Sequence, residues 1–126
     1  MRRTLLGIAI GSALVIGLVA SAGAGAQRAG TTSCHLTAHE QRSLGASYVT
    51  SLKVKNTTCA KGKAVTLAFN KCRTAGGKPQ GKCNRKVGRY TCTEHRYDAV
   101  PHVQYSSKVT CVSGKKRVLN TYTQNT

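Results

Sequence analysis

The chain has 126 residues, of which 20 are lysine or arginine and only 3 are acidic, so its formal net charge is +17. A chain of this length has room for one small domain. Its six cysteines include no Cys-x-x-Cys pair, which argues against a zinc module. The charge predicts association with polyanions such as nucleic acid, anionic wall polymers or a membrane surface, although it could also simply keep an exported protein in solution.

Residues 1–26 have the pattern of a secretory signal peptide. Two arginines precede an apolar stretch of 16 residues, and an Ala-Gly-Ala sequence ending at Ala26 fits the small-x-small cleavage pattern. The stretch is shorter than the roughly 18 residues expected of a spanning helix. We therefore expect cleavage before Gln27 and a secreted or envelope-associated protein.

Residues 27–46 are rich in Gly, Ala, Ser and Thr and are expected to form a loose N-terminal arm, ahead of a domain at 47–126. Residues 47–56 alternate as a half-buried strand does, with Leu52 and Val54 on the same side as Tyr48 and Thr50. Residues 59–73 follow an Asn-Thr-Thr sequence suited to capping, and their small and apolar residues recur at helical spacing. Gly62 lies on that helical face, where a missing side chain would allow close packing on a sheet.

Residues 73–89 contain four glycines, one proline and no acidic residue, so they are expected to form a loop. We expect this loop to bind polyanions through six basic side chains: Arg73, Lys78, Lys82, Arg85, Lys86 and Arg89. Three strands follow, the last two joined by a hairpin around Gly114. The predicted fold is α+β, with one helix on a small antiparallel sheet in the order β-α-β-β-β.

An even number of cysteines in a short exported chain indicates a disulfide framework, because that compartment is oxidising. Cys72 ends the predicted helix and Cys83 lies in the loop that follows, so we expect these two to pair. The start of the helix could reach a central strand, which suggests Cys59–Cys111. Cys34 and Cys92 would then form the third pair.

The sequence YTCTEHRYD at 90–98 places a carboxylate, an imidazole and a guanidinium together. On a strand, Glu94 and Arg96 face one way and can pair, whereas His95 faces the other. Small exported microbial ribonucleases have a similar architecture and use a glutamate, arginines and a histidine, roles for which Glu94, Arg96 and His102 are weak candidates. No stretch matches the active-site motif of that family, so the ribonuclease remains an alternative and we expect no enzyme activity.

Two histidines, His35 and His39, have the i, i+4 spacing that binds zinc or copper when it is helical. They lie in the predicted arm and lack the His-Glu-x-x-His order of zinc proteases. We expect no metal and no cofactor.

Several motifs resemble those of small exported proteins of high-GC Gram-positive bacteria, over about residues 57 to 122. They are Cys59-x-x-Gly62-x-x-Val65-x-x-Ala68-Phe69, Tyr90-x-Cys92 and Val109-x-Cys111-x-x-Gly114. This chain departs from them in having Arg89 in place of a glycine, and Cys72 and Cys83 as an additional pair. The resemblance implies the fold and the exported location and implies no activity.

Together these features predict an exported, basic, disulfide-rich binder of anionic polymers or of the envelope surface. A secreted antagonistic or antimicrobial protein is the first alternative, and a ribonuclease is the second.

Overall fold

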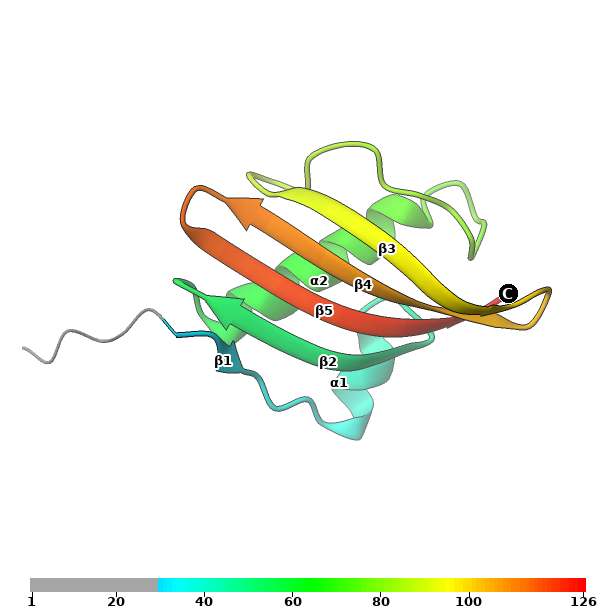
Figure 1. Cartoon of the computed structure of the whole chain (residues 1–126), viewed down its shortest axis with the longest axis horizontal. Coiled ribbons are helices and arrows are strands. Elements are labelled where there is room, and N and C mark those ends of the chain that lie inside the picture. The colour runs from blue at the N-terminus through cyan, green and yellow to red at the C-terminus, as the bar shows by residue number, and fades with distance from the viewer. Residues whose placement is uncertain (1–29) are drawn as a thin grey trace, which may run out of the picture.

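A computed structural model describes residues 30–126, so the predicted signal peptide and its cleavage site lie outside the described residues. The fold is α+β, as predicted: one long helix packs on a five-stranded antiparallel sheet (Figure 1). In chain order the elements are β1 (Thr32–Ser33), α1 (Ala38–Ser43), β2 (Tyr48–Lys55), α2 (Cys59–Arg73), β3 (Thr91–Val100), β4 (Gln104–Ser113) and β5 (Lys116–Asn125). The strand order in the sheet is β1-β2-β5-β4-β3.

Helix α2 spans the predicted residues, and its ends follow from local chemistry. Thr58 caps the N-terminus, where its side chain accepts a hydrogen bond from the Lys61 amide at 3.2 Å. Gly62 faces the sheet so closely that a Cβ at this position would lie 2.6 Å from Val54 Cγ1. The sequence had predicted this close approach. Phe69, 1% exposed, fills the centre of the interface between helix and sheet.

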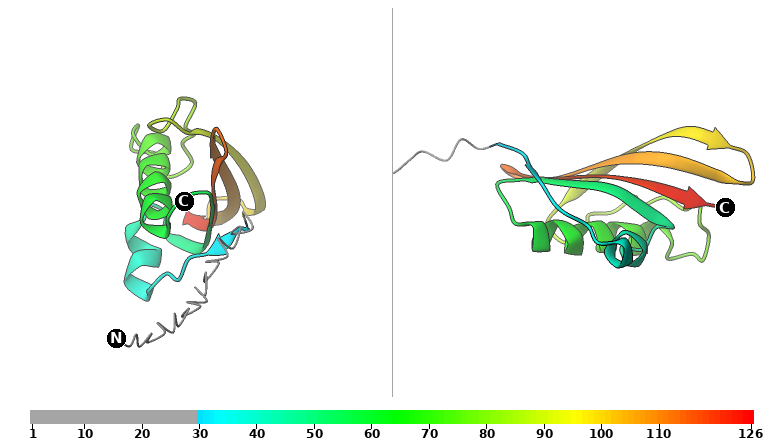
Figure 2. Two further views of the ribbon diagram at one scale, coloured as in Figure 1. Left: turned by 90° about the vertical axis from the view of Figure 1, so that its left-hand side faces the viewer. Right: turned by 90° about the horizontal axis from the view of Figure 1, so that it is seen from below.

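Both helices lie on one face of the sheet, which we call the inner face (Figure 2). Val49, Leu52 and Val54 of β2 point to this face and are almost fully buried. The predicted alternation was wrong before Leu52, because the register shifts between Val49 and Ser51. The bulge leaves Tyr48 exposed and turns Val49 into the core.

The segment expected to be a loose arm is ordered from residue 30 onward. Thr32–Ser33 pairs with the edge of β2, and Thr37 forms a capping box with Glu40 at the start of α1. Leu36 and Leu44, on either side of α1, are buried in the core. Buried leucines, the pairing with β2 and one disulfide therefore hold a segment whose composition looked flexible.

The structure confirms one of the three predicted disulfides, Cys72–Cys83. The other two predictions were wrong, because the cysteines pair as Cys34–Cys59 and Cys92–Cys111. Cys92 and Cys111 lie directly opposite each other on the neighbouring strands β3 and β4. The Cys34 amide donates to Leu52 O at 2.8 Å, which fixes the arm beside β2 and near the start of α2. The register between β3 and β4 therefore decides one pair, and the position of the arm beside β2 and the start of α2 decides the other.

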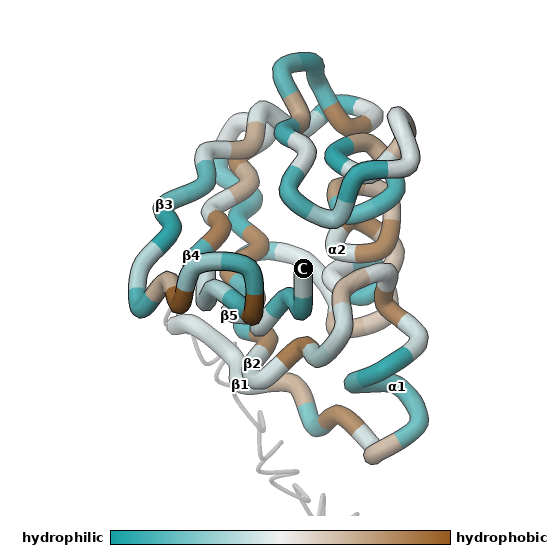
Figure 3. Tube along the Cα trace, turned by 90° about the vertical axis from the view of Figure 1, so that its right-hand side faces the viewer, coloured by the Kyte–Doolittle hydropathy of each residue, from teal (hydrophilic) through white to brown (hydrophobic). Residues whose placement is uncertain are grey.

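Figure 3 views the molecule from the end where the chain terminates, with α1 and α2 on one side and the sheet on the other. Within residues 30–126, neither helix has the length and hydrophobicity that crossing a bilayer requires.

Candidate functional site

A cluster of hydrogen-bonded polar side chains lies on the inner face, centred on Glu94 of β3. Arg96 donates from Nε to Glu94 Oε1 at 3.0 Å and from Nη2 to Oε2 at 3.2 Å. Ser107 Oγ of β4 donates to Oε1 at 3.1 Å, and the Tyr122 hydroxyl of β5 donates to the same oxygen. The carboxylate therefore joins three strands. The sequence had predicted the Glu94–Arg96 pair as i, i+2 neighbours on a strand, and the structure confirms it.

These contacts keep Glu94 ionised. Burial on its own would raise the pKa of Glu94, but the hydrogen bonds from Arg96 and Tyr122 and the charge of Arg96 outweigh it, so the pKa lies below its usual value. Burial and the hydrogen bond to Glu94 both raise the pKa of Tyr122, which therefore stays protonated as a donor. A carboxylate that accepts four hydrogen bonds holds the fold together and is a poor general base.

Arg73, the last residue of α2, is 2% exposed and has no carboxylate within salt-bridge distance among the described residues. Its side chain donates to Asn70 Oδ1 at 2.7 Å and to Gln124 Oε1 at 2.6 Å. Its guanidinium also lies 4.5 Å from the ring centroid of Tyr122. Tyr122 therefore contacts both charges: its ring lies against the Arg73 guanidinium, and its hydroxyl donates to the Glu94 carboxylate.

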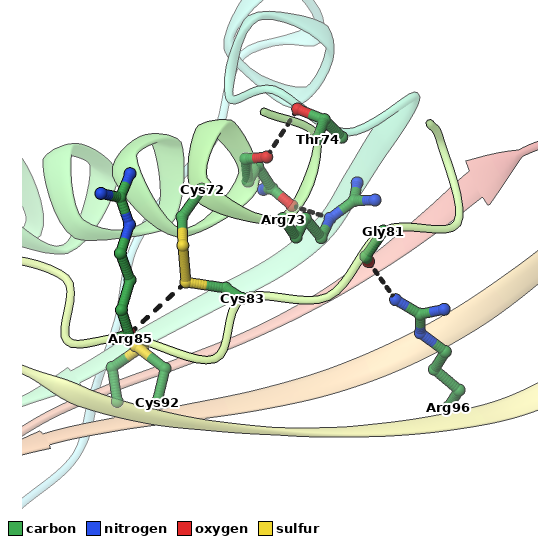
Figure 4. Close-up of a disulfide and its surroundings, with 10 residues drawn as sticks. Cys72, Arg73, Thr74, Gly81, Cys83, Arg85, Cys92 and Arg96 are labelled. Carbon is green, nitrogen blue, oxygen red and sulfur yellow. Dashed lines mark hydrogen bonds between the residues drawn. A yellow bond between two sulfur atoms is a disulfide. The ribbon is translucent and has the colours of Figure 1, made fainter. Parts of the chain in front are cut away.

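The segment between α2 and β3, residues 74–90, corresponds to the basic loop predicted at 73–89, and Arg73 and Arg96 hold its first half against the sheet. Arg73 Nη1 and the Tyr105 hydroxyl donate to Pro79 O at 2.6 and 3.0 Å. Arg96 donates to Gln80 O at 2.9 Å and to Gly81 O at 2.5 Å (Figure 4). Three consecutive carbonyls thus receive charged donors, which form stronger hydrogen bonds than neutral ones.

The loop is anchored at two further points. The Cys72–Cys83 disulfide ties its centre to the end of α2 (Figure 4). Val87 and Tyr90, both buried, form an isolated bridge that fixes its last residues. The basic side chains therefore lie on short spans between fixed points.

Five of the six cations predicted to bind polyanions are exposed. They are Lys78, Lys82, Arg85, Lys86 and Arg89. The prediction was wrong for Arg73, because this side chain points into the core and its donors are occupied. The run of basic residues does not by itself indicate which one is buried. Helical spacing could have indicated it, because Arg73 follows Phe69 and Asn70 on the buried face of α2.

Two surface hollows lie where the loop meets the rest of the molecule. One, of about 400 Å³, is bordered by Lys82, Asn84, Glu94 and Arg96. The other, of about 470 Å³, lies between α2 and the end of the loop and is bordered by Lys61, Arg89 and Lys116. Lysine or arginine side chains border both, which suits an anionic ligand.

The three weak catalytic candidates do not share one hollow. Glu94 and Arg96 border the hollow beside the loop, whereas His102 borders another with Arg96 and Tyr105. His95 points to the opposite face of the sheet, as predicted. His95 also borders the hollow beside the loop, although as the next residue on the strand it alternates to the other face from Glu94.

Sequence reasoning missed the members of the cluster outside β3, namely Ser107, Tyr105, Tyr122 and Gln124. Tyr105 and Ser107 alternate on β4, as do Tyr122 and Gln124 on β5, so the period of two could have placed each pair on one face. Which residues lie opposite one another depends on the register between the strands.

No group of three or more His, Cys, Asp or Glu residues within 30–126 is placed to hold a metal ion. Comparisons with protein-family models, curated proteins and solved structures find no match for this chain.

Proposed function

We propose that the protein is exported and binds anionic polymers through the exposed cations of the basic loop. The observation that carries the proposal is the fixation of this loop at the Arg73 and Arg96 contacts, at the disulfide and at the bridge to Tyr90. A loop that is already ordered loses little conformational entropy on binding, so more of the electrostatic attraction appears as affinity.

The distribution of acidic residues supports the same proposal. Glu94 is neutralised within the molecule by Arg96, and Glu40 pairs with Lys63 at 2.5 Å. The loop itself contains no acidic residue. Its positive charge is therefore directed at the solvent.

The exported location rests on the N-terminal sequence and on three disulfides, which persist in oxidising compartments. Anionic polymers available there include wall polyphosphates, released nucleic acid and lipid headgroups. The shared chemistry is a series of phosphate charges along a chain or a surface.

The test is a titration of labelled duplex DNA, RNA and inorganic polyphosphate with the oxidised protein at several salt concentrations. The triple variant Lys82→Gln/Arg85→Gln/Lys86→Gln should lower the slope of log K against log salt on duplex DNA by about 3, since each phosphate contact contributes about 0.9.

A matched control variant, Arg42→Gln/Lys71→Gln/Lys115→Gln, removes the same charge from exposed positions on the two helices and in the turn between β4 and β5. It should leave most of the slope in place. If the two triple variants change affinity and slope equally, the net charge alone drives binding and the loop is not the binding surface.

A further inference from the structure

The sheet has a second face, opposite the two helices, that no helix or loop of residues 30–126 covers (Figure 2). We call this the open face. It consists of the outward positions of β2 to β5, and the residues that matter most are Lys53, Lys55, Lys108, Arg117, His95 and Tyr97. All six lie in the paired region of the sheet, so their relative positions are set by backbone hydrogen bonds.

The paired outward positions of the open face carry four cations and no carboxylate, and the exposed Asp98 lies in the irregular stretch after Tyr97. Lys55 lies opposite Arg117, Lys53 lies two residues along β2, and Lys108 lies on β4 beside His95. Glu94, the acidic residue within the paired part of β3, points inward. Two copies of this face would repel each other, which argues against a second copy of the chain as its partner.

Aromatic rings lie on the same face. The rings of His95 and Tyr97 are stacked, with centroids 6.5 Å apart and planes 16° from parallel. Lys108 Nζ lies 5.8 Å from the centroid of the Tyr97 ring. Tyr48 lies at the far end of the same cross-strand row, but its hydroxyl donates to Gln41 of α1, so this ring lies at the edge of the sheet and is not part of the open face.

A shallow hollow of about 280 Å³ opens beside this row, and Lys53, Lys108 and Thr121 are among its lining residues. It is just below the usual range of about 300–1,000 Å³ for sites that enclose a small molecule. It can take a phosphate group, and the rest of an extended ligand would then lie across the strands.

We propose that the open face binds single-stranded nucleic acid, with phosphates near Lys53, Lys108 and Arg117 and bases stacked on Tyr97 and His95. This inference rests on the proposed function and narrows its ligand class. A cationic surface that carries exposed rings is how sequence-tolerant single-strand binding is generally achieved. Backbone phosphates provide the charge contacts, and the unpaired bases provide flat surfaces for the rings.

Two other occupants fit the open face less well. A wall polymer of phosphate and polyol has no rings, so Tyr97 and His95 would contribute nothing to its binding. A protein partner would need an apolar centre, whereas the large aliphatic side chains at outward positions are Val112 and Leu119, among many Thr and Ser residues. Duplex DNA keeps its bases stacked and paired, so it can use the cations only.

The experiment compares fluorescein-labelled oligo(dT) of 15 nucleotides, a duplex of the same length and inorganic polyphosphate, each with the oxidised protein. Tyr97→Leu should weaken oligo(dT) binding about 5- to 100-fold, the range expected for one lost stacking contact. It should change polyphosphate binding less than about 2-fold, because phosphate contacts do not use the ring. Tyr97→Phe keeps the ring and should restore oligo(dT) binding.

Tyrosine emission gives a second readout, because the chain has five tyrosines and no tryptophan. Oligo(dT) should quench this emission, and the Tyr97→Phe variant should lose part of the quenching while it keeps the affinity. Unfolding midpoints of the variants, followed by circular dichroism, establish that each one is folded.

A charge-matched pair of variants separates the two surfaces. Lys53→Gln/Lys108→Gln/Arg117→Gln should weaken oligo(dT) more than Lys82→Gln/Arg85→Gln/Lys86→Gln does, and the order should reverse for the duplex. If polyphosphate and duplex bind but Tyr97→Leu leaves oligo(dT) unchanged, the open-face proposal is overturned while the proposed function stands. If no polymer binds, both are overturned.

Discussion

Arg73 and Arg96 come from opposite sides of the core and bind consecutive carbonyl oxygens of one loop. Arg73 donates a hydrogen bond to Pro79 O at 2.6 Å, and Arg96 donates to Gln80 O at 2.9 Å and to Gly81 O at 2.5 Å. The guanidinium groups of Arg73 and Arg96 therefore fix the position of the loop that carries the exposed lysines and arginines. Glu94 and Tyr122 complete the arrangement, because they hold the two arginines in place.

The Glu94 pKa predicts a stability component that depends on pH. The folded pKa is below the unfolded value of about 4.3, so the folded state binds fewer protons, and this stabilisation is complete above about pH 5. It is lost as pH falls through the folded pKa. Urea unfolding between pH 2 and 7 should show a steeper acid loss in the wild type than in Glu94→Gln.

Glu40→Gln is the control for that measurement. Lys63 and the Thr37 amide lower the pKa of Glu40 to about 2, but this carboxylate is 31% exposed, against 11% for Glu94. Its contribution should disappear at about 0.5 M NaCl because salt screens exposed charges, whereas the Glu94 component should persist. Equal suppression of both by salt would contradict the buried role of Glu94.

Gly81 should tolerate no side chain. A Cβ at this position would lie 1.9 Å from Arg73 O, so Gly81→Ala has to displace either the loop or the end of α2. We expect a loss of about 2 kcal/mol in the free energy of unfolding. Gly76→Ala, in the same loop with no atom within 4 Å, is the control and should cost little. A thermal midpoint of Gly81→Ala equal to that of Gly76→Ala would refute the close packing.

Asn120 is a site where a polar side chain costs stability. It is 2% exposed, and neither its amide nitrogen nor its oxygen has a hydrogen-bond partner in the protein. Its cross-strand neighbours Leu52 and Val109 are apolar. Asn120→Leu should therefore raise the free energy of unfolding by about 1 kcal/mol, measured by urea denaturation.

Asn70→Leu provides the opposite case. Asn70 Nδ2 donates to Leu44 O at 2.9 Å, and Oδ1 accepts from Arg73 Nε at 2.7 Å. The same substitution there should destabilise by about 2 kcal/mol or more, because it leaves a buried guanidinium donor unpaired. Equal effects at the two asparagines would show that hydrogen bonding does not set the difference.

Loss of the Cys72–Cys83 disulfide should lower the affinity for polyphosphate and leave the number of phosphate contacts unchanged. Cys72→Ala/Cys83→Ala removes a loop closure worth about 3 kcal/mol in the chain-entropy model and frees the centre of the basic loop. Polyphosphate affinity should fall, because a mobile loop loses more entropy on binding. The salt slope should stay the same, since all five cations remain. A changed slope with unchanged affinity would contradict the role of the tether.

Local physical rules were enough to predict much of the fold. The bounds of α2, the close approach at Gly62 and the i, i+2 pairing of Glu94 with Arg96 follow from helical spacing, capping and the period of a strand. These features involve residues near one another in the chain, so the sequence contains their cause. The Cys72–Cys83 pair belongs to the same group, because 11 positions separate its cysteines.

Only the tertiary structure decided the rest. The register between β3 and β4 makes Cys92 and Cys111 direct neighbours, and the pairing of β5 with β4 brings Tyr122 to Glu94. The packing of α2 on the sheet turned Arg73 from a predicted surface cation into a buried member of the polar cluster. Contacts between strands depend on which edges pair and in what register, and many pairings satisfy the same alternation of side chains. The sequence determined α2, the strands β2 to β5 and the charge, and the tertiary packing determined which charged side chains are buried and which face the solvent.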